Sequence, residues 1–290
     1  PSKALLHSTE LFHFLKDKAA SHGIKAEKTA IDVPALMKRK DGVVERLCCG
    51  VATLVEKRGI TILQGRGSLT SESGQVLVTS KSGKNTYAAK AILIATGSNP
   101  RHLGVEGEDT YAGRGVAYCA ICDAPLFKGK EVLIAGGGNS AVEAALDLAK
   151  VASSVTLIHR SQLRADSILI KKLYEEPKIT VHLETQITEI FGEKAMEGLR
   201  ALHKPTGEEK TLYADGLFIE IGHVPNTGVF KNLLTLNDQG EILVDVKNRT
   251  NLPGVYAAGD VTNVPYKQIV IAASDGAKAA LSINEYLNSK

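Results

Sequence analysis

The run EVLIAGGGNSAVEAALDLAKVASSVTLI, residues 131–158, decides the fold of the chain. It begins with a continuous apolar segment, 131–135, which is typical of a strand buried on both faces in a parallel sheet. A glycine-rich turn follows, then apolar residues at helical spacing over 142–148 and a second apolar strand at 154–158. Strand, helix and strand in this order predict a βαβ unit, and hence an α/β fold around a parallel sheet.

The turn of this unit matches the pattern GxGxxA at Gly136, Gly138 and Ala141. Between a strand and a helix, the first glycine permits the tight turn and the second lets the backbone approach a pyrophosphate, while the alanine lets the helix pack closely. The free N–H groups at the positive end of the helix would hold that pyrophosphate. We therefore predict a dinucleotide site here. The alternative is a glycine-rich turn in an enzyme that binds no dinucleotide.

The end of the second strand indicates which nicotinamide cofactor is preferred. An acidic residue there would accept a hydrogen bond from the ribose 2′-hydroxyl of NAD, but this sequence has His159, Arg160 and then Arg164. Guanidinium groups suit bidentate contacts to a 2′-phosphate. The segment therefore favours NADPH, with NADH possible. The alternative is that both arginines are solvated surface charges.

The cysteines fall in two places. Of the four, Cys48 and Cys49 are adjacent, whereas Cys119 and Cys122 form a CxxC pattern. Four are too few for a disulfide-stabilised secreted scaffold of this length, and a zinc site would need two further ligands. We predict that Cys119 and Cys122 are redox-active and that no metal is bound, although an inert pair stays open. We expect Cys48 and Cys49 at buried helix positions.

Composition excludes several classes of function. The chain has 290 residues, 43% of them hydrophobic, and a formal net charge of +3 from 35 basic and 32 acidic residues. This near balance indicates neither a nucleic acid nor an anionic membrane as a partner. No apolar run approaches the roughly 20 residues that span a bilayer, and the first ten residues carry no signal-peptide pattern. We expect a cytoplasmic protein and, because residue 1 is not Met, a chain that begins inside a longer gene product.

The remaining patterns extend the α/β assignment. Gly-punctuated, alternating segments between residues 67 and 90 indicate a small β-meander, and 98–112 resembles a linker. Further strands are expected at 60–63, 91–95, 217–222 and 252–258, and helices at 4–20, 34–55 and 268–287.

Several motifs resemble those of low-molecular-weight thioredoxin reductases, which are class II pyridine nucleotide-disulfide oxidoreductases. The segment GRGVAYCAICD, residues 113–123, is similar to the active-site segment of that family and likewise precedes the glycine-rich strand. The resemblance covers residues 91–290, and the tail is also close to that of the flavoprotein that reduces peroxiredoxins. The other matching segments are 136–145, 216–218, 221–227, 258–260, 266–269 and 276–280.

The resemblance implies two Rossmann-like, three-layer domains. Residues 1–111 with 245–290 would bind FAD, and 112–244 would bind NAD(P)H and carry the CxxC. Electrons would pass from reduced FAD to a Cys119–Cys122 disulfide and then to thioredoxin or a similar small disulfide protein, through a mixed disulfide. A homodimer is expected, as in the family.

Roles for single residues also follow from the resemblance. Asp123 would be the general acid/base for the thiols, the alternative being a helix-capping acid. Asp260 would lie near the ribitol and pyrophosphate of FAD, the alternative being a simple Gly-Asp turn. The residues assigned to cofactor binding by the motifs and the resemblance are Lys3, Thr96, Gly97, Gly136, Gly138, Asn139, Ser140, Ala141, Glu143, His159, Arg160, Arg164, Ile221, Gly222, Gly259, Asp260, Lys267, Gln268 and Ile269.

The first 70 residues resemble another branch of the superfamily. Segments 1–6, 40–44 and 65–69 are similar to dihydrolipoamide dehydrogenases, in which the residue matching Lys3 lies beside the flavin. The N-terminal βαβ unit that holds the ADP half of FAD in both families does not occur in the sequence. The FAD-binding domain is therefore expected to be incomplete at its N-terminus and discontinuous in sequence.

Three functions stay open on this basis. The favoured one is an FAD-dependent NADPH:disulfide oxidoreductase that reduces thioredoxin or a similar small redox protein. The second is an NAD-dependent dihydrolipoamide dehydrogenase, consistent with Ser161 where the thioredoxin reductase pattern has a further Arg. The third is a catalytically inactive nucleotide-binding fragment.

Overall fold

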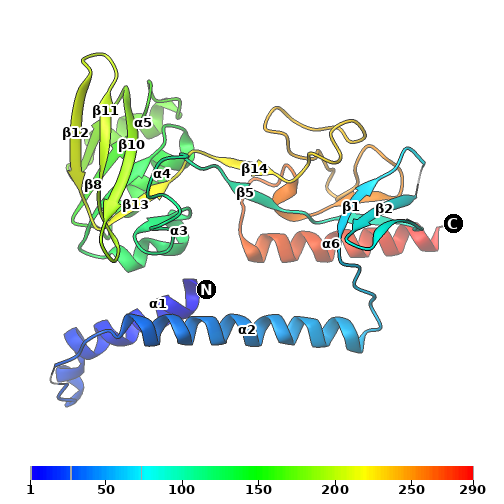
Figure 1. Cartoon of the computed structure of the whole chain (residues 1–290), viewed down its shortest axis with the longest axis horizontal. Coiled ribbons are helices and arrows are strands. Elements are labelled where there is room, and N and C mark those ends of the chain that lie inside the picture. Colours follow the sequence, from blue (N-terminus) through cyan, green and yellow to red (C-terminus); the bar gives the residue numbers. More distant parts are fainter. Residues whose placement is uncertain (1, 27, 73, 290) are drawn as a thin grey trace. The chain divides into compact units, whose positions relative to one another are not determined.

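The structure is a computed structural model that describes residues 2–26, 28–72 and 74–289. The chain divides into two compact units (Figure 1). The first comprises residues 1–60 and 102–222, and the second 61–101 and 223–290. The backbone therefore passes from one unit to the other near residues 60, 101 and 222.

A five-stranded sheet forms the centre of the first unit. Its strand order is β6-β13-β7-β8-β9, and every neighbouring pair is parallel. The strands are β6 (Val116–Ala117), β13 (Gly216–Ile219), β7 (Glu131–Ala135), β8 (Ser154–Ile158) and β9 (Ile179–His182). The chain continues from β7 to β8 on one side, while β13 lies on the other. The carboxyl ends of β7 and β13 thus meet at a topological switch point, where open α/β sheets bind ligands.

Two further layers cover the faces of this sheet. Helices α4 (Asn139–Ala149) and α5 (Ser167–Glu175) pack on one face, and a three-stranded antiparallel sheet packs on the other (Figure 1). That second sheet consists of β10 (Thr185–Gly192), β11 (Met196–His203) and β12 (Glu208–Tyr213). The predicted three-layer α/β fold is thereby confirmed for this unit.

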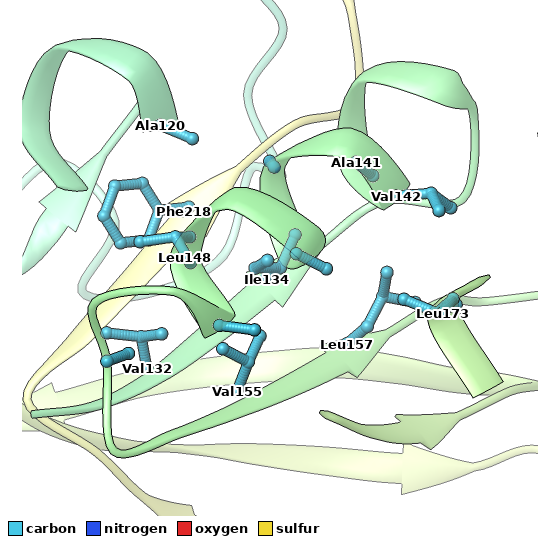
Figure 2. Close-up of a cluster of buried hydrophobic side chains, with 14 of the residues drawn as sticks. Ala120, Val132, Ile134, Ala141, Val142, Leu148, Val155, Leu157, Leu173 and Phe218 are labelled. Carbon is cyan, nitrogen blue, oxygen red and sulfur yellow. The ribbon is translucent and has the colours of Figure 1, made fainter. Parts of the chain in front are cut away.

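The apolar run of β7 follows from this layering. Val132 and Ile134 point into the core under α4, where Figure 2 shows them with Leu148 and Phe218. Leu133 and Ala135 belong to the opposite core, against the antiparallel sheet. A strand covered on both faces needs apolar residues at every position, because neither face meets water.

The N-terminal helices belong to the same unit. Helix α1 (Ser2–His13) continues through a π-helical turn (Phe14–Lys18) and a 3-10 turn (Ala19–His22), and α2 (Val33–Lys57) follows. Asp32 caps α2, since its Oδ1 accepts a hydrogen bond from Ala35 N at 2.9 Å.

Helix α2 runs on beyond its contact with α1 (Figure 1). Cys48 and Cys49 lie on this later part of α2 and are both exposed. The prediction that they occupy buried helix positions is therefore wrong. The helical assignment itself is correct, but among the described residues nothing covers this stretch of the helix.

The second unit begins with the predicted meander, β1 (Arg66–Leu69), β2 (Gln75–Ser80) and β3 (Gly83–Ala88). Strand β4 (Ile92–Ile94) pairs in parallel with β15 (Val255–Ala257), and β5 (Ser98–Pro100) pairs antiparallel with β14 (His223–Pro225). Helix α6 (Ile269–Asn288) closes the chain. Ile94, Phe230, Ile242 and Val261 share the buried core of this unit.

One predicted strand does not form. Ile60 to Leu63 is irregular, and the side chains of Ile60, Ile62 and Leu63 are 57%, 60% and 46% exposed. A strand needs a neighbour to satisfy its backbone N–H and C=O groups. Within the described residues no strand pairs with this segment, so its apolar pattern does not produce one.

Candidate active site

Cys119 and Cys122 form a disulfide whose Cα atoms are 5.3 Å apart. Cys119 immediately precedes the short helix α3 (Ala120–Asp123), and its Sγ accepts a hydrogen bond from Cys122 N at 3.3 Å. Both cysteines are partly exposed, and Ile121 between them is 74% exposed. The two cysteines singled out by their spacing are thus bonded to one another at a surface that an incoming thiol or disulfide can reach.

Ala120 anchors this segment in the protein. Its methyl group is only 4% exposed and belongs to the core that contains Phe218 and α4 (Figure 2). Its backbone N–H donates to Oε1 of Glu220 at 3.0 Å. Glu220 directly follows β13, so the redox segment is tied to the carboxyl end of the parallel sheet. Burial raises the pKa of the Glu220 carboxyl, while the hydrogen bond from Ala120 opposes that shift.

Sequence analysis did not identify Glu220. The signal available was its position, because it is the acidic residue that ends the apolar run of β13 next to the recognised Ile221 and Gly222. Those two neighbours lie at the same strand end, and Gly222 has a φ of +96°, a conformation that favours glycine.

Asp123 ends α3, and its backbone N donates to Cys119 O at 3.1 Å. The residue also precedes a 3-10 turn, Ala124–Phe127, which its side chain does not cap. The geometry gives no support to capping of that turn as the role of this acid.

A polar cluster fixes the residue before the disulfide. The hydroxyl of Tyr118 donates to Oε1 of Glu108 at 2.9 Å and lies 3.2 Å from Nδ1 of His102. Glu108 is only 2% exposed, and its other oxygen accepts from Gly104 N at 2.7 Å. Burial and the neighbouring Glu108 carboxylate raise the pKa of Tyr118, so its phenol stays protonated. The sequence analysis did not predict this cluster.

The glycine-rich turn joins β7 to α4 at the switch point. Gly136 has a φ of +154°, and a Cβ atom on it would lie 2.3 Å from Glu220 O and 2.6 Å from the Cβ of Ala141. Ala141 is fully buried. A Cβ on Gly138 would meet nothing within 4 Å. Gly136 is therefore required by close packing within the protein, whereas the backbone at Gly138 borders open space of the kind that a pyrophosphate would fill.

The loop after β8 folds back onto this turn. The ring of His159 lies against Gly137, and Arg164 N donates to Gly137 O at 2.7 Å. Burial lowers the pKa of His159, and the guanidinium groups of Arg164 and Arg160 lower it further. Both arginines are exposed, so the structure brings two cationic groups to the edge of the glycine turn.

The other predicted residues of this region lie at the start of α4. The side-chain amide of Asn139 donates to Asp166 Oδ2 at 3.0 Å and accepts from Asp166 N at 2.8 Å. This pair fastens the first turn of α4 to the loop that carries the arginines. Ser140 and Glu143 are exposed on the same helix.

In the second unit, Thr96 and Gly97 are held by Asn226. Thr96 Oγ1 donates to Asn226 O at 3.0 Å, Asn226 Nδ2 donates to Thr96 O at 2.8 Å, and Asn226 N donates to Gly97 O at 2.9 Å. These bonds continue the short β5–β14 ribbon and fix the backbone after β4.

The remaining predicted flavin residues gather between β15 and α6. Gly259 has a φ of +75° and begins a 3-10 turn (Gly259–Val261), and Gln268 is the residue before α6. Lys267 pairs with Glu241 at 2.7 Å, and Ile269 is 80% exposed. In the part of the chain that the structure describes, the buried Oδ1 of Asp260 has no hydrogen-bond partner. An orphaned buried acceptor fits a site that a hydroxyl-bearing cofactor completes. The side chain of Lys3 lies outside the described residues.

Neither a metal centre nor a membrane span occurs in the described residues. No group of three or more His, Cys, Asp and Glu side chains is arranged there to hold a metal ion. None of the helices there is long and apolar enough to cross a membrane.

The sequence matches the family described as "Pyridine nucleotide-disulphide oxidoreductase" over residues 1–276. The chain belongs to this oxidoreductase family. The match confirms the resemblance inferred from the motifs, and the family includes the thioredoxin-reductase-like flavoprotein oxidoreductases.

Individual relatives of this family member agree with that assignment. It is 45% identical to the F component of alkyl hydroperoxide reductase from Pseudomonas putida over 79% of the chain and 44% of the relative, and 41% identical to that of Staphylococcus aureus over 81% and 44%. The chain thus spans less than half the length of these curated relatives.

Solved structures give the same picture. Thioredoxin reductase from Streptococcus pyogenes superposes with a TM-score of 0.74 and 32% identity, over 92% of this chain and 84% of that one. Thioredoxin reductase from Giardia duodenalis gives 0.75 and 32%, over 90% and 83%. The disulfide at 119 and 122 lies in a chain with the fold of these disulfide reductases.

Proposed function

We propose that this chain is an FAD-dependent NADPH:disulfide oxidoreductase that reduces thioredoxin or a similar small redox protein through Cys119 and Cys122. In this proposal residues 112–244 bind NADPH, and residues 1–111 with 245–290 contribute to the FAD site. The protein works as a cytoplasmic homodimer.

One observation carries the proposal. The disulfide segment and the glycine-rich turn are built on the same strand ends, since Glu220 accepts from Ala120 N through its carboxylate while its backbone oxygen lies against Gly136. A dinucleotide turn and a reversible sulfur pair on one sheet edge are the parts that a pyridine nucleotide-dependent disulfide reductase requires.

When bound, the two cofactors supply a hydride from NADPH and a flavin that accepts it and passes on both electrons. The chain's own residues then manage the sulfur chemistry. Cys119 and Cys122 accept two electrons and two protons as their S–S bond breaks. One thiolate attacks the partner disulfide, a mixed disulfide forms, and the second cysteine resolves it and restores the original bond. Asp123 is proposed to move the protons of these thiols.

The nucleotide preference is proposed from the charges beyond β8. Arg160 and Arg164 would bind the 2′-phosphate, and the buried neutral His159 would support the loop from beneath. On the second unit, Asp260 would accept a hydrogen bond from the FAD ribitol, and Gln268 at the start of α6 would face the flavin's pyrimidine end.

An absorbance spectrum followed by anaerobic titration with NADPH tests the proposal. We expect flavin bands that bleach on titration, and two new thiols at Cys119 and Cys122. Cys122→Ser should retain flavin bleaching and lose disulfide turnover. Cys48→Ser, an exposed cysteine on α2, is the matched control and should keep full turnover. A colourless protein that remains colourless with added FAD would contradict the proposal and support a catalytically inactive nucleotide-binding fragment.

Two other substrates are separated by the same assay. Preference for NADH together with turnover of dihydrolipoamide would identify the dihydrolipoamide dehydrogenase alternative. Because the curated relatives are named as components of alkyl hydroperoxide reductase, a disulfide protein of a peroxide-reducing system is the second candidate partner. Comparing turnover with thioredoxin and with such a protein distinguishes the two.

A further inference from the structure

We propose that Glu220 is a positioning residue that tunes the Cys119–Cys122 couple toward the reducing side, by occupying the Ala120 N–H and placing a carboxylate beside the sulfurs. The inference deepens the proposed function and rests on it. It concerns a residue that lies far from the CxxC motif in sequence.

The contact has two fixed ends. Ala120 is held by its buried methyl group, which packs in the core with Phe218. Glu220 is held by its backbone, since its N donates to Ala135 O at 2.8 Å and its O lies close to Gly136. Between them the Ala120 N–H meets the carboxylate at 3.0 Å. Neither end can move away without disturbing the sheet or the core.

Three backbone N–H groups of this turn are already used. Cys122 N donates to Cys119 Sγ, Asp123 N donates to Cys119 O, and Ala120 N donates to Glu220. Thiolates at the start of a helical turn are stabilised by free N–H groups and by positive charge. Here the Ala120 N–H is withheld from the sulfurs and a negative group stands in its place.

The sign of the effect follows. A carboxylate next to the redox pair disfavours the thiolate and so raises the thiol pKa. Disulfides whose reduced form is stabilised are strong oxidants, so destabilising the reduced thiolate makes the couple a stronger reductant. Such a couple suits an enzyme that must deliver electrons to a partner disulfide.

Glu220→Gln tests the inference. The amide keeps an oxygen that accepts from Ala120 N and removes the charge, and because the burial of that charge is unfavourable, the variant should fold. We expect the equilibrium constant of the couple against dithiothreitol to shift about tenfold, or about 30 mV, toward the oxidising side. The pKa of the attacking thiol, taken from the pH dependence of alkylation, should fall by about one unit.

The measurement uses the full chain, with Cys48 and Cys49 replaced by serine so that only the redox pair is counted. Glu131→Gln, an exposed carboxylate at the opposite end of β7, is the control and should leave the potential unchanged. Glu220→Ala should shift the potential in the same direction as Glu220→Gln and serves if the amide variant is unstable. Thermal unfolding of each variant separates a change of potential from a loss of structure.

The outcomes distinguish the inference from the proposed function. A reversible wild-type couple with the same potential in both Glu220 variants, or a shift toward the reducing side, would overturn the inference alone. A wild-type pair that cannot be reduced reversibly would overturn both. A shift equal to that of Glu131→Gln would mean that general surface charge, and not this contact, sets the potential, and would also overturn the inference.

Discussion

Replacing Gly136 with alanine is expected to damage the first unit through packing, independently of any cofactor. The added Cβ would lie 2.3 Å from the backbone oxygen of Glu220 and 2.6 Å from the Cβ of Ala141. Overpacking of this kind costs about 1 to 3 kcal/mol, and the positive φ of +154° adds about 1 to 3 kcal/mol for a residue with a side chain. We expect the free energy of unfolding to fall by about 3 kcal/mol. For a domain of this size that corresponds to about 6 to 12 °C in Tm.

Gly138→Ala is the matched control, because its Cβ would meet no protein atom within 4 Å. It should leave Tm within about 2 °C of the wild type and still weaken NADPH binding, since the methyl group would occupy the space proposed for the pyrophosphate. Differential scanning calorimetry gives Tm without cofactor, and titration calorimetry gives the affinity for NADPH. Equal Tm values for Gly136→Ala and the wild type would refute the packing argument, and unchanged NADPH affinity in Gly138→Ala would refute the placement of the pyrophosphate.

The remaining predictions concern the loop after β8. Replacing Arg160 and Arg164 together by alanine should weaken NADPH binding about 10- to 100-fold, from about 1.5 to 3 kcal/mol for a charged hydrogen bond, and leave NADH binding unchanged; an equal loss for both would argue against a 2′-phosphate site. Because the pKa of His159 is lowered in the folded protein, the unfolded chain takes up this proton first as pH falls below about 6.5, so stability decreases from there down to the folded pKa. In His159→Asn the Tm should vary less with pH between 7 and 5, and an identical pH dependence would contradict this.

The sequence was sufficient to predict the centre of the first unit. The run 131–158 fixes strand, glycine turn, helix and strand, because buried strands need apolar residues on both faces and the turn needs glycine where a Cβ would clash. The meander and the strand at 91–95 were predicted for similar reasons. The pairing of Cys119 with Cys122 was likewise anticipated, since CxxC spacing brings the two sulfurs together across one helical turn.

What could not be predicted depends on contacts distant in sequence. The exposure of Cys48 and Cys49 is set by where α1 ends along α2, and the failure of residues 60–63 to form a strand is set by the lack of a neighbour in the described residues. Glu220 gains its place beside the disulfide through a contact across 100 residues. No local pattern encodes such a contact, because the helical or strand period only says which face a side chain takes.

The placement of the sulfurs just after strand β6 has a mechanical consequence. β6 is an edge strand joined to β13 by only two residue pairs, Leu217 with Val116 and Phe218 with Ala117. The glycine turn, by contrast, rises from β7 in the middle of the sheet. A large partner can therefore loosen the margin that carries the sulfurs while the middle stays intact, because local opening requires the least free energy where a ladder is shortest.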